Sequence, residues 1–118
     1  MLFHYQIREY FLYSKKFDMR KGIDSLAALV NNELGKNPAS GDLFIFINRT
    51  QRLIKMLHWQ QDGFAVFYKR LEKGTYEFPT GEINTNSFCI NAEKLIFILG
   101  GVALKSVKKR KRYSHQIV

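Results

Sequence analysis

Residues 43–71 read LFIFINRTQRLIKMLHWQQDGFAVFYKRL, and this stretch decides the fold. Three apolar runs, 43–47, 53–59 and 64–71, are separated by two polar segments. The first run is apolar at every position, which is typical of a strand covered on both faces. Asp62-Gly63 in the second polar segment favours a tight hairpin turn. The stretch therefore predicts three consecutive antiparallel strands.

A helical pattern precedes these strands. Asp18 is a good N-cap, because its carboxylate can accept hydrogen bonds from the first backbone N–H groups. Apolar residues then recur at helical spacing, forming a stripe of Ile23, Leu26, Ala27, Val30 and Leu34. Gly35 stands where a left-handed C-cap belongs, and Pro38 blocks continuation. We expect a helix over about residues 19–34.

The remaining elements are shorter. Residues 10–13 (YFLY) are rich in aromatic side chains and predict a first strand, and residues 76–78 are a candidate for a further one. Residues 80–86 are expected to form a polar loop. Asn91 is predicted to cap a second helix that ends at Gly100-Gly101. The predicted fold class is α+β: an antiparallel meander of four to five strands, one long helix on a face, and a shorter C-terminal helix.

Length and composition predict one domain, at residues 1–104. The chain has 118 residues, of which 46% are hydrophobic, so a core can be buried. Apolar runs, such as residues 95–99, are too short to span a bilayer, so we expect no membrane contact. The single cysteine, Cys89, forbids an internal disulfide and favours the reducing cytoplasm. Its apolar context predicts a small core residue.

Positive charge is concentrated near the C-terminus. The formal net charge is +9. Six positive charges fall between positions 105 and 112, on Lys105, Lys108, Lys109, Arg110, Lys111 and Arg112. We expect residues 105–118 to form a basic, disordered tail. Such a tail on a mildly basic domain favours a polyanionic partner, most often nucleic acid, although a purely solubilising tail is the alternative.

The predicted start of the long helix is a candidate anion site. Arg20 and Lys21 would lie in the first turn, where the helix dipole disfavours cations by about 0.3–1 kcal/mol each. Gly22 would add about 1 kcal/mol of helix-propensity cost. A phosphate bound to the free N–H groups would explain both costs. The structural alternative is that Gly22 allows close packing and Arg20 pairs with Asp24.

A second candidate surface lies on the predicted hairpin. If Asp62-Gly63 is a two-residue turn, Lys55 faces Arg70, and this like-charge pair favours an anion nearby. A four-residue turn would change the register and remove the pair. Further basic residues could extend the surface, namely Arg49, Arg52, Lys69 and Lys73. Trp59 and Tyr68 could stack on nucleic acid, but we expect both aromatics to be core residues.

Catalytic chemistry is not indicated. Metal-dependent strand transfer needs clustered carboxylates, whereas Asp18, Asp42 and Asp62 have structural explanations at a cap, a strand entry and a turn. Glu72 is expected to pair with Lys69 or Arg70. One cysteine and three scattered histidines offer no zinc-ligand spacing. We expect no catalytic residue, no metal and no cofactor.

Several blocks of the chain resemble one known family. They are residues 18–24 (DMRKGID), 41–46 (GDLFIF), 55–59 (KMLHW), 62–64 (DGF) and 68–74 (YKRLEKG). In this order they resemble the TnpB-type, Orf2-like accessory proteins of a bacterial insertion-sequence family that encodes a separate transposase. The RNA-guided nuclease of the same name is a different, longer protein. The resemblance covers about residues 10–101 and implies a role in transposition without an established catalytic role.

Two functional hypotheses follow. In the first, the chain is a non-enzymatic accessory protein that binds DNA through its basic surface and tail, with no motif that predicts base reading. In the second, it is an adaptor that contacts the transposase or another protein of the element through a sheet edge or an apolar patch.

Overall fold

The computed structural model describes residues 6–15, 17, 20–78 and 86–101. The chain is α+β, as the sequence predicts. Its elements in order are β1 (Tyr10–Tyr13), α1 (Ile23–Asn32), β2 (Leu43–Ile47), β3 (Leu53–Trp59), β4 (Phe64–Arg70), β5 (Ser87–Ile90) and α2 (Ala92–Gly100). β1, β2, β3 and β4 begin and end within one residue of the ranges that the sequence patterns predict.

The five strands form one mixed sheet in the order β4-β3-β2-β1-β5. β2, β3 and β4 are antiparallel neighbours, as predicted. β1 instead pairs with β2 in parallel, with Tyr10 opposite Leu43 and Leu12 opposite Ile45. The prediction of an all-antiparallel meander is therefore wrong. The physical reason is that α1 connects the two strands, and a helical crossover returns the chain in the same direction.

β5 completes the sheet beside β1 and was not predicted. It runs antiparallel to β1, with Tyr10 opposite Ile90. The candidate strand at residues 76–78 does not form. Tyr76 is fully buried instead, and its backbone N–H donates to the carbonyl of Gln51 at 2.6 Å. The predicted polar loop falls mostly on residues 79–85, which lie outside the described part of the chain.

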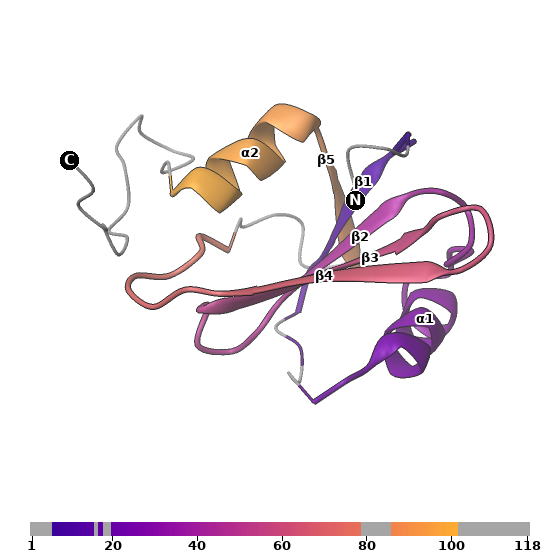
Figure 1. Cartoon of the computed structure of the whole chain (residues 1–118), viewed down its shortest axis with the longest axis horizontal. Helices are drawn as coiled ribbons and strands as arrows, with labels where there is room; N and C mark the ends of the chain where they lie inside the picture. The colour runs from indigo at the N-terminus through magenta and orange to yellow at the C-terminus, as the bar shows by residue number, and fades with distance from the viewer. Residues whose placement is uncertain (1–5, 16, 18–19, 79–85, 102–118) are drawn as a thin grey trace.

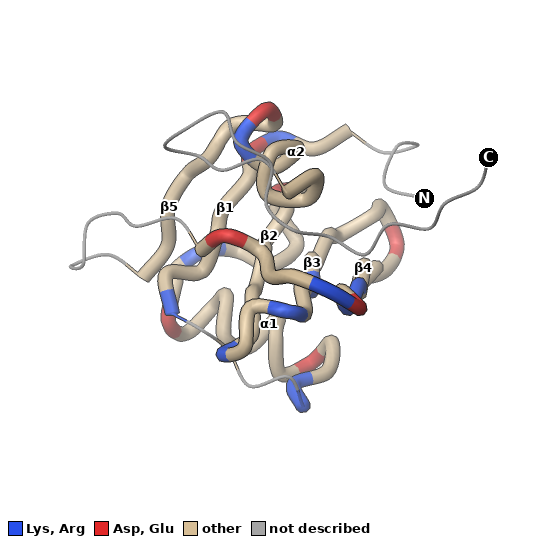
Figure 2. The backbone as a smooth tube through the Cα atoms, turned by 90° about the vertical axis from the view of Figure 1, so that its left-hand side faces the viewer, with Lys and Arg blue, Asp and Glu red and all other residues tan. Residues whose placement is uncertain are grey.

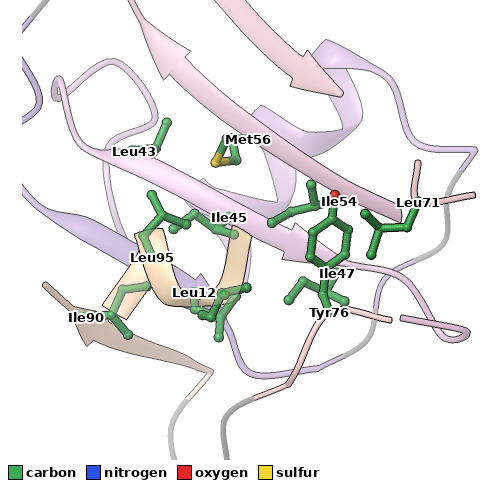
Figure 3. Close-up of a cluster of buried hydrophobic side chains, with 11 residues drawn as sticks. Leu12, Leu43, Ile45, Ile47, Ile54, Met56, Leu71, Tyr76, Ile90 and Leu95 are labelled. Atoms are coloured by element: carbon green, nitrogen blue, oxygen red, sulfur yellow. The ribbon is translucent and has the colours of Figure 1, made fainter. Parts of the chain in front are cut away.

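The two helices lie on opposite sides of the sheet (Figure 1). Tyr13, Phe44, Phe46 and Leu57 pack with Leu26, Leu29 and Val30 of α1 on one side. On the other side, Leu95 and Ile98 of α2 join a second cluster built from the opposite faces of the same strands (Figure 3). β2 contributes to both clusters, and all five of its residues are buried, which confirms the prediction of a strand covered on both faces.

α1 is shorter than predicted and begins at Ile23. Gly22 is its N-cap, with no side-chain hydrogen bond, and the predicted cap, Asp18, lies outside the described residues. Leu26 and Val30 of the predicted stripe are fully buried, whereas Ile23 is 41% exposed. Gly35 has a φ of 64°, the left-handed conformation expected after the helix. Arg20 and Lys21 therefore precede the helix, so the dipole cost that motivated an anion site is absent.

α2 begins and ends as predicted. The side chain of Asn91 accepts a hydrogen bond from the backbone N–H of Lys94 at 2.7 Å, and Gly101 caps the other end with a φ of 80°. The buried face carries Leu95 and Ile98, while Ile96 is 64% exposed.

Two further predictions are wrong. The hairpin register is shifted, because Gln60 N–H donates to the carbonyl of Gly63 and closes a four-residue turn. Lys55 therefore faces Tyr68, and Arg70 faces Leu53, so the like-charge pair does not exist. Cys89 is exposed and not in the core, because it lies on the edge strand β5, beside Glu9.

Candidate nucleic-acid interface

The sheet topology gathers several loops at one end. β2 and β4 run in the same direction and β3 runs against them, so β2 and β4 finish where β3 begins. The chain after β1 arrives at the same end, because Phe17 forms a parallel bridge with Asn48. Two segments dominate this end: the turn at residues 48–52 and the segment at residues 71–78.

Five basic side chains lie at this end, and we call them the basic end: Arg49, Arg52, Lys69, Arg70 and Lys73. All five are exposed. The acidic residues of the same loops are Glu72 and Glu77, so positive charge is in excess. Figure 2 shows that basic positions elsewhere are spread over several elements, with acidic positions between them. The topology thus brings together five basic residues that the hairpin pattern singled out.

Arg52 has a structural role within the basic end. Its guanidinium Nη2 donates to the carbonyl of Glu72 at 2.7 Å and to that of Leu71 at 3.3 Å. The backbone N–H of Leu71 returns a hydrogen bond to the carbonyl of Arg52 at 2.7 Å. These bonds hold the segment after β4 against the turn before β3. They also fix the Arg52 side chain, which lowers the entropy lost when it binds a ligand.

Asn48 organises the turn from within. It is only 4% exposed. Its side-chain Oδ1 accepts from the backbone N–H groups of Arg52 at 3.1 Å and Leu53 at 3.0 Å, and its Nδ2 donates to the Thr50 hydroxyl at 3.2 Å. Two partners belong to the turn and the third, the N–H of Leu53, begins β3, so the positions of Thr50 and Arg52 depend on one buried amide.

An open pocket of about 270 Å³ lies at the basic end. Its lining consists of Asn48, Thr50, Arg52, Leu53, Arg70 and Glu72. Arg70 and Glu72 form an exposed ion pair across 3.4 Å, as the sequence predicts for Glu72. Exposed pairs of this kind contribute little to stability, about 0–1 kcal/mol. Both side chains are therefore available to rearrange around a ligand.

Three other basic residues of the domain were predicted to bind nucleic acid. They are Arg20, Lys21 and Lys55, and they lie outside the turn at residues 48–52 and outside residues 69–73. Lys55 is 9% exposed, and its ammonium donates to the backbone carbonyl of Lys21 at 2.8 Å. The same ammonium lies 5.3 Å from the ring centre of Tyr68 and 5.9 Å from that of Phe17. Arg20 is exposed in the segment that precedes α1. Lys55 thus lies beneath the surface, whereas Arg20 lies on it.

The two aromatic residues of the hairpin differ in exposure. Trp59 is half-buried and packs edge-on against Phe64, with ring centres 4.9 Å apart. Tyr68 is 54% exposed, so the expectation that it is a core residue is wrong. It lies two residues before Arg70 on β4, and strand alternation places both side chains on one face of the sheet. Tyr68 therefore lies on the same sheet face as Arg70, which lines the pocket.

The remaining predicted residues are those of the tail: Lys108, Lys109, Arg110, Lys111 and Arg112. They lie outside the described residues. α2 begins just after β5. It runs toward the side of the molecule that holds the turn between β2 and β3 and the end of β4 (Figure 1). α2 thus ends toward the side of the basic end, and the basic run follows it in the sequence.

Within the described ranges, no three His, Cys, Asp or Glu side chains gather to form a metal site. Over the same ranges, no helix is long and apolar enough to cross a membrane.

Comparison with known proteins identifies the class of protein. The family model described as IS66 Orf2 like protein, TnpB_IS66, matches residues 8–109. The chain belongs to this family, which confirms the resemblance seen in the sequence. The family implies an accessory role in transposition of IS66-type insertion sequences, and it is not a family of known enzymes.

Two relatives come from Sinorhizobium fredii. The uncharacterized protein y4hO is 35% identical over 85 residues, which cover 72% of each chain. The uncharacterized protein y4jC is 27% identical over 93 residues, covering 79% of this chain and 78% of that protein. No solved structure matches the chain significantly.

Sequence reasoning did not single out Asn48 or Thr50, and it named Tyr68 as a possible stacking residue but expected it in the core. A usable pattern was present in the hairpin. In the observed register Trp59 faces Phe64 and Leu57 faces Val66. The two-residue turn would instead place Lys55 opposite Arg70, and like charges directly opposite each other are destabilising, so avoidance of this pair favours a four-residue turn. The correct register would have placed Tyr68 and Arg70 beside the start of β3.

Proposed function

We propose that this chain is a non-enzymatic accessory protein of transposition that binds DNA through the basic end and the basic run at residues 105–112. The main support for this proposal is that five exposed Lys and Arg side chains lie at one end of the sheet. Such a surface matches the phosphate backbone, whose neutralisation dominates DNA affinity. Contacts of this kind position a protein on DNA without reading its sequence.

The expected size of the effect follows from counterion release. With about six phosphates neutralised, the logarithm of the association constant should fall with the logarithm of salt concentration with a slope of about −5. Fluorescence anisotropy measures this with a duplex carrying the element's terminal inverted repeat and with a scrambled duplex, each at several salt concentrations. Preference for the repeat would add end recognition, whereas equal binding means a non-specific clamp. No binding at low salt contradicts the proposal.

A matched pair of variants locates the surface. Arg49→Gln/Lys73→Gln removes two charges from the basic end and should reduce the slope by about 2. Arg8→Gln/Lys94→Gln removes the same charge from the opposite end of the sheet, where β1 begins and β5 finishes. All four side chains are exposed. If both pairs weaken binding equally, the basic end is not the DNA surface.

A second candidate function is an adaptor that binds the transposase. It is favoured by the exposed apolar side chains on α2, Ile96 at 64% and Phe97 at 36%, since exposed apolar groups that lie together often mark protein contacts. Tail deletion separates the two functions. A chain lacking residues 105–118 should still bring down the transposase if it is an adaptor, and Ile96→Glu should abolish the pull-down without changing DNA affinity.

A further inference from the structure

We propose that the pocket at the basic end, together with Tyr68, binds one unpaired nucleotide of single-stranded DNA whose base carries an exocyclic amino group. This inference rests on the proposed DNA-binding function and names the form of DNA that the site takes. It depends on four groups: two guanidinium groups and one carboxylate that line the pocket, and one exposed ring on the sheet face of Arg70.

The size of the pocket limits the ligand. Pockets for drug-sized molecules occupy about 300–1,000 Å³, and this pocket has a volume of about 270 Å³. This volume lies near the lower end of that range, which suits a ligand of about the size of one nucleotide unit. An unpaired base can enter such a pocket, whereas a base in a duplex is held in the stack and must be extruded at a cost of a few kcal/mol.

The charges of the lining suit two different groups on the ligand. Arg52 and Arg70 supply donors that match a phosphate. Glu72 lines the same pocket, and a lone phosphate would be repelled by its carboxylate. A carboxylate is an acceptor that pairs with an amino group such as cytosine N4. The 3.4 Å contact to Arg70 uses only part of its acceptor capacity. A nucleotide with an amino-bearing base satisfies both kinds of lining group.

Tyr68 supplies the stacking surface. Its ring is 54% exposed and lies on the same sheet face as Arg70. Base–aromatic stacking contributes about 1–3 kcal/mol per base and needs an unpaired base with a free face. The pairing of an exposed ring with a basic pocket is therefore typical of single-strand binding and is not needed for contacts to duplex phosphates.

The test compares oligo(dC) with oligo(dU), which differ mainly in an amino group against a carbonyl. By anisotropy on the full chain, oligo(dC) should bind about fivefold more tightly or better, the smallest discrimination of a good base contact. Glu72→Ala should bring this ratio to about one even though removing a negative charge strengthens binding to both oligomers. Glu77→Ala is the matched control and should leave the ratio unchanged.

Tyr68 is tested by a second ratio, of single-strand to duplex affinity. Tyr68→Ala should weaken oligo(dC) binding about tenfold while duplex affinity stays unchanged, and Tyr68→Phe should retain both. Equal affinity for oligo(dC) and oligo(dU), or a preference that survives Glu72→Ala, overturns the inference while leaving duplex binding intact. Failure to bind any DNA overturns the proposed function as well.

Discussion

Lys55 and Lys21 are joined by a hydrogen bond of 2.8 Å from the ammonium of Lys55 to the backbone carbonyl of Lys21. This bond connects β3 to the residue before the N-cap of α1. It also explains how a lysine that is only 9% exposed is tolerated on β3, because a buried charge must be hydrogen-bonded or paired. Two aromatic rings lie near the same ammonium.

Replacing Lys55 by methionine tests this connection. Lys55→Met keeps most of the side-chain volume but removes the donor, so we expect the free energy of unfolding to fall by about 1–3 kcal/mol. Urea denaturation measures the change. Lys69→Met, at an exposed position on the neighbouring strand, is the control and should shift stability by no more than about 0.5 kcal/mol. Equal effects of the two variants would show that the bond contributes nothing.

The contribution of the Asn48 side chain to stability can be tested in the same way. Its side chain is buried and satisfies two backbone N–H groups of the turn. Asn48→Ala leaves these donors without their acceptor, and we expect a loss of about 2–3 kcal/mol. Asn48→Asp keeps an acceptor oxygen and should lose less. If the two variants are equally unstable in urea, the acceptor role of Asn48 is not what holds the turn.

Tyr13 should make stability depend on alkaline pH. Burial of the side chain, and then the 2.8 Å hydrogen bond to Glu33, raise the pKa of Tyr13 from 10.0 to about 12. The folded chain therefore holds this proton more tightly than the unfolded chain does. The resulting stabilisation is fully present below pH 10 and is lost as pH rises toward 12.

The measurement is a comparison of variants across that range. Tyr13→Phe should show a weaker fall in urea midpoint between about pH 9 and pH 11.5 than the unmodified chain, because the phenol no longer titrates. An unchanged slope in Tyr13→Phe would mean that another group controls the alkaline loss.

Cys89 should be accessible but slow to react. Partial burial of the thiol and its hydrogen bond to Glu9 raise the pKa of Cys89, which lowers the fraction of reactive thiolate at neutral pH. Glu9→Gln removes the negative charge and should speed alkylation by iodoacetamide, followed by mass spectrometry. Glu93→Gln, on α2, should leave the rate unchanged. A rate that does not respond to Glu9→Gln would show that burial alone sets the reactivity.

The hairpin shows how far local patterns reach. Alternation and turn residues predict where β2, β3 and β4 begin and end to within a residue or so. They do not fix the register by themselves, because Asp62-Gly63 fits a two-residue turn and is also compatible with the observed four-residue one. A shift in turn length re-pairs every residue of the hairpin. The predicted Lys55–Arg70 contact failed for this reason.

The candidate site was likewise only partly predictable from the sequence. The basic residues of the hairpin are recognisable from composition, and five of them do meet at one end of the sheet. The pocket is not recognisable, because its lining combines a turn, the start of β3 and the segment after β4. Arg52 belongs to this site through bonds to two carbonyls about twenty residues away in sequence. No local pattern encodes such contacts.

The sequence by itself determined the α+β class, the three consecutive strands β2, β3 and β4, and the cap of α2, because each depends on residues close together in the chain. It also determined the family, through short blocks in a fixed order. Only the tertiary structure decided the parallel pairing of β1 with β2, the place of β5 at the far edge, and the exposure of Tyr68. These features depend on which surfaces meet once α1 and α2 have covered the two faces of the sheet. That choice is made by packing over long sequence distances, which local propensity and periodicity do not carry.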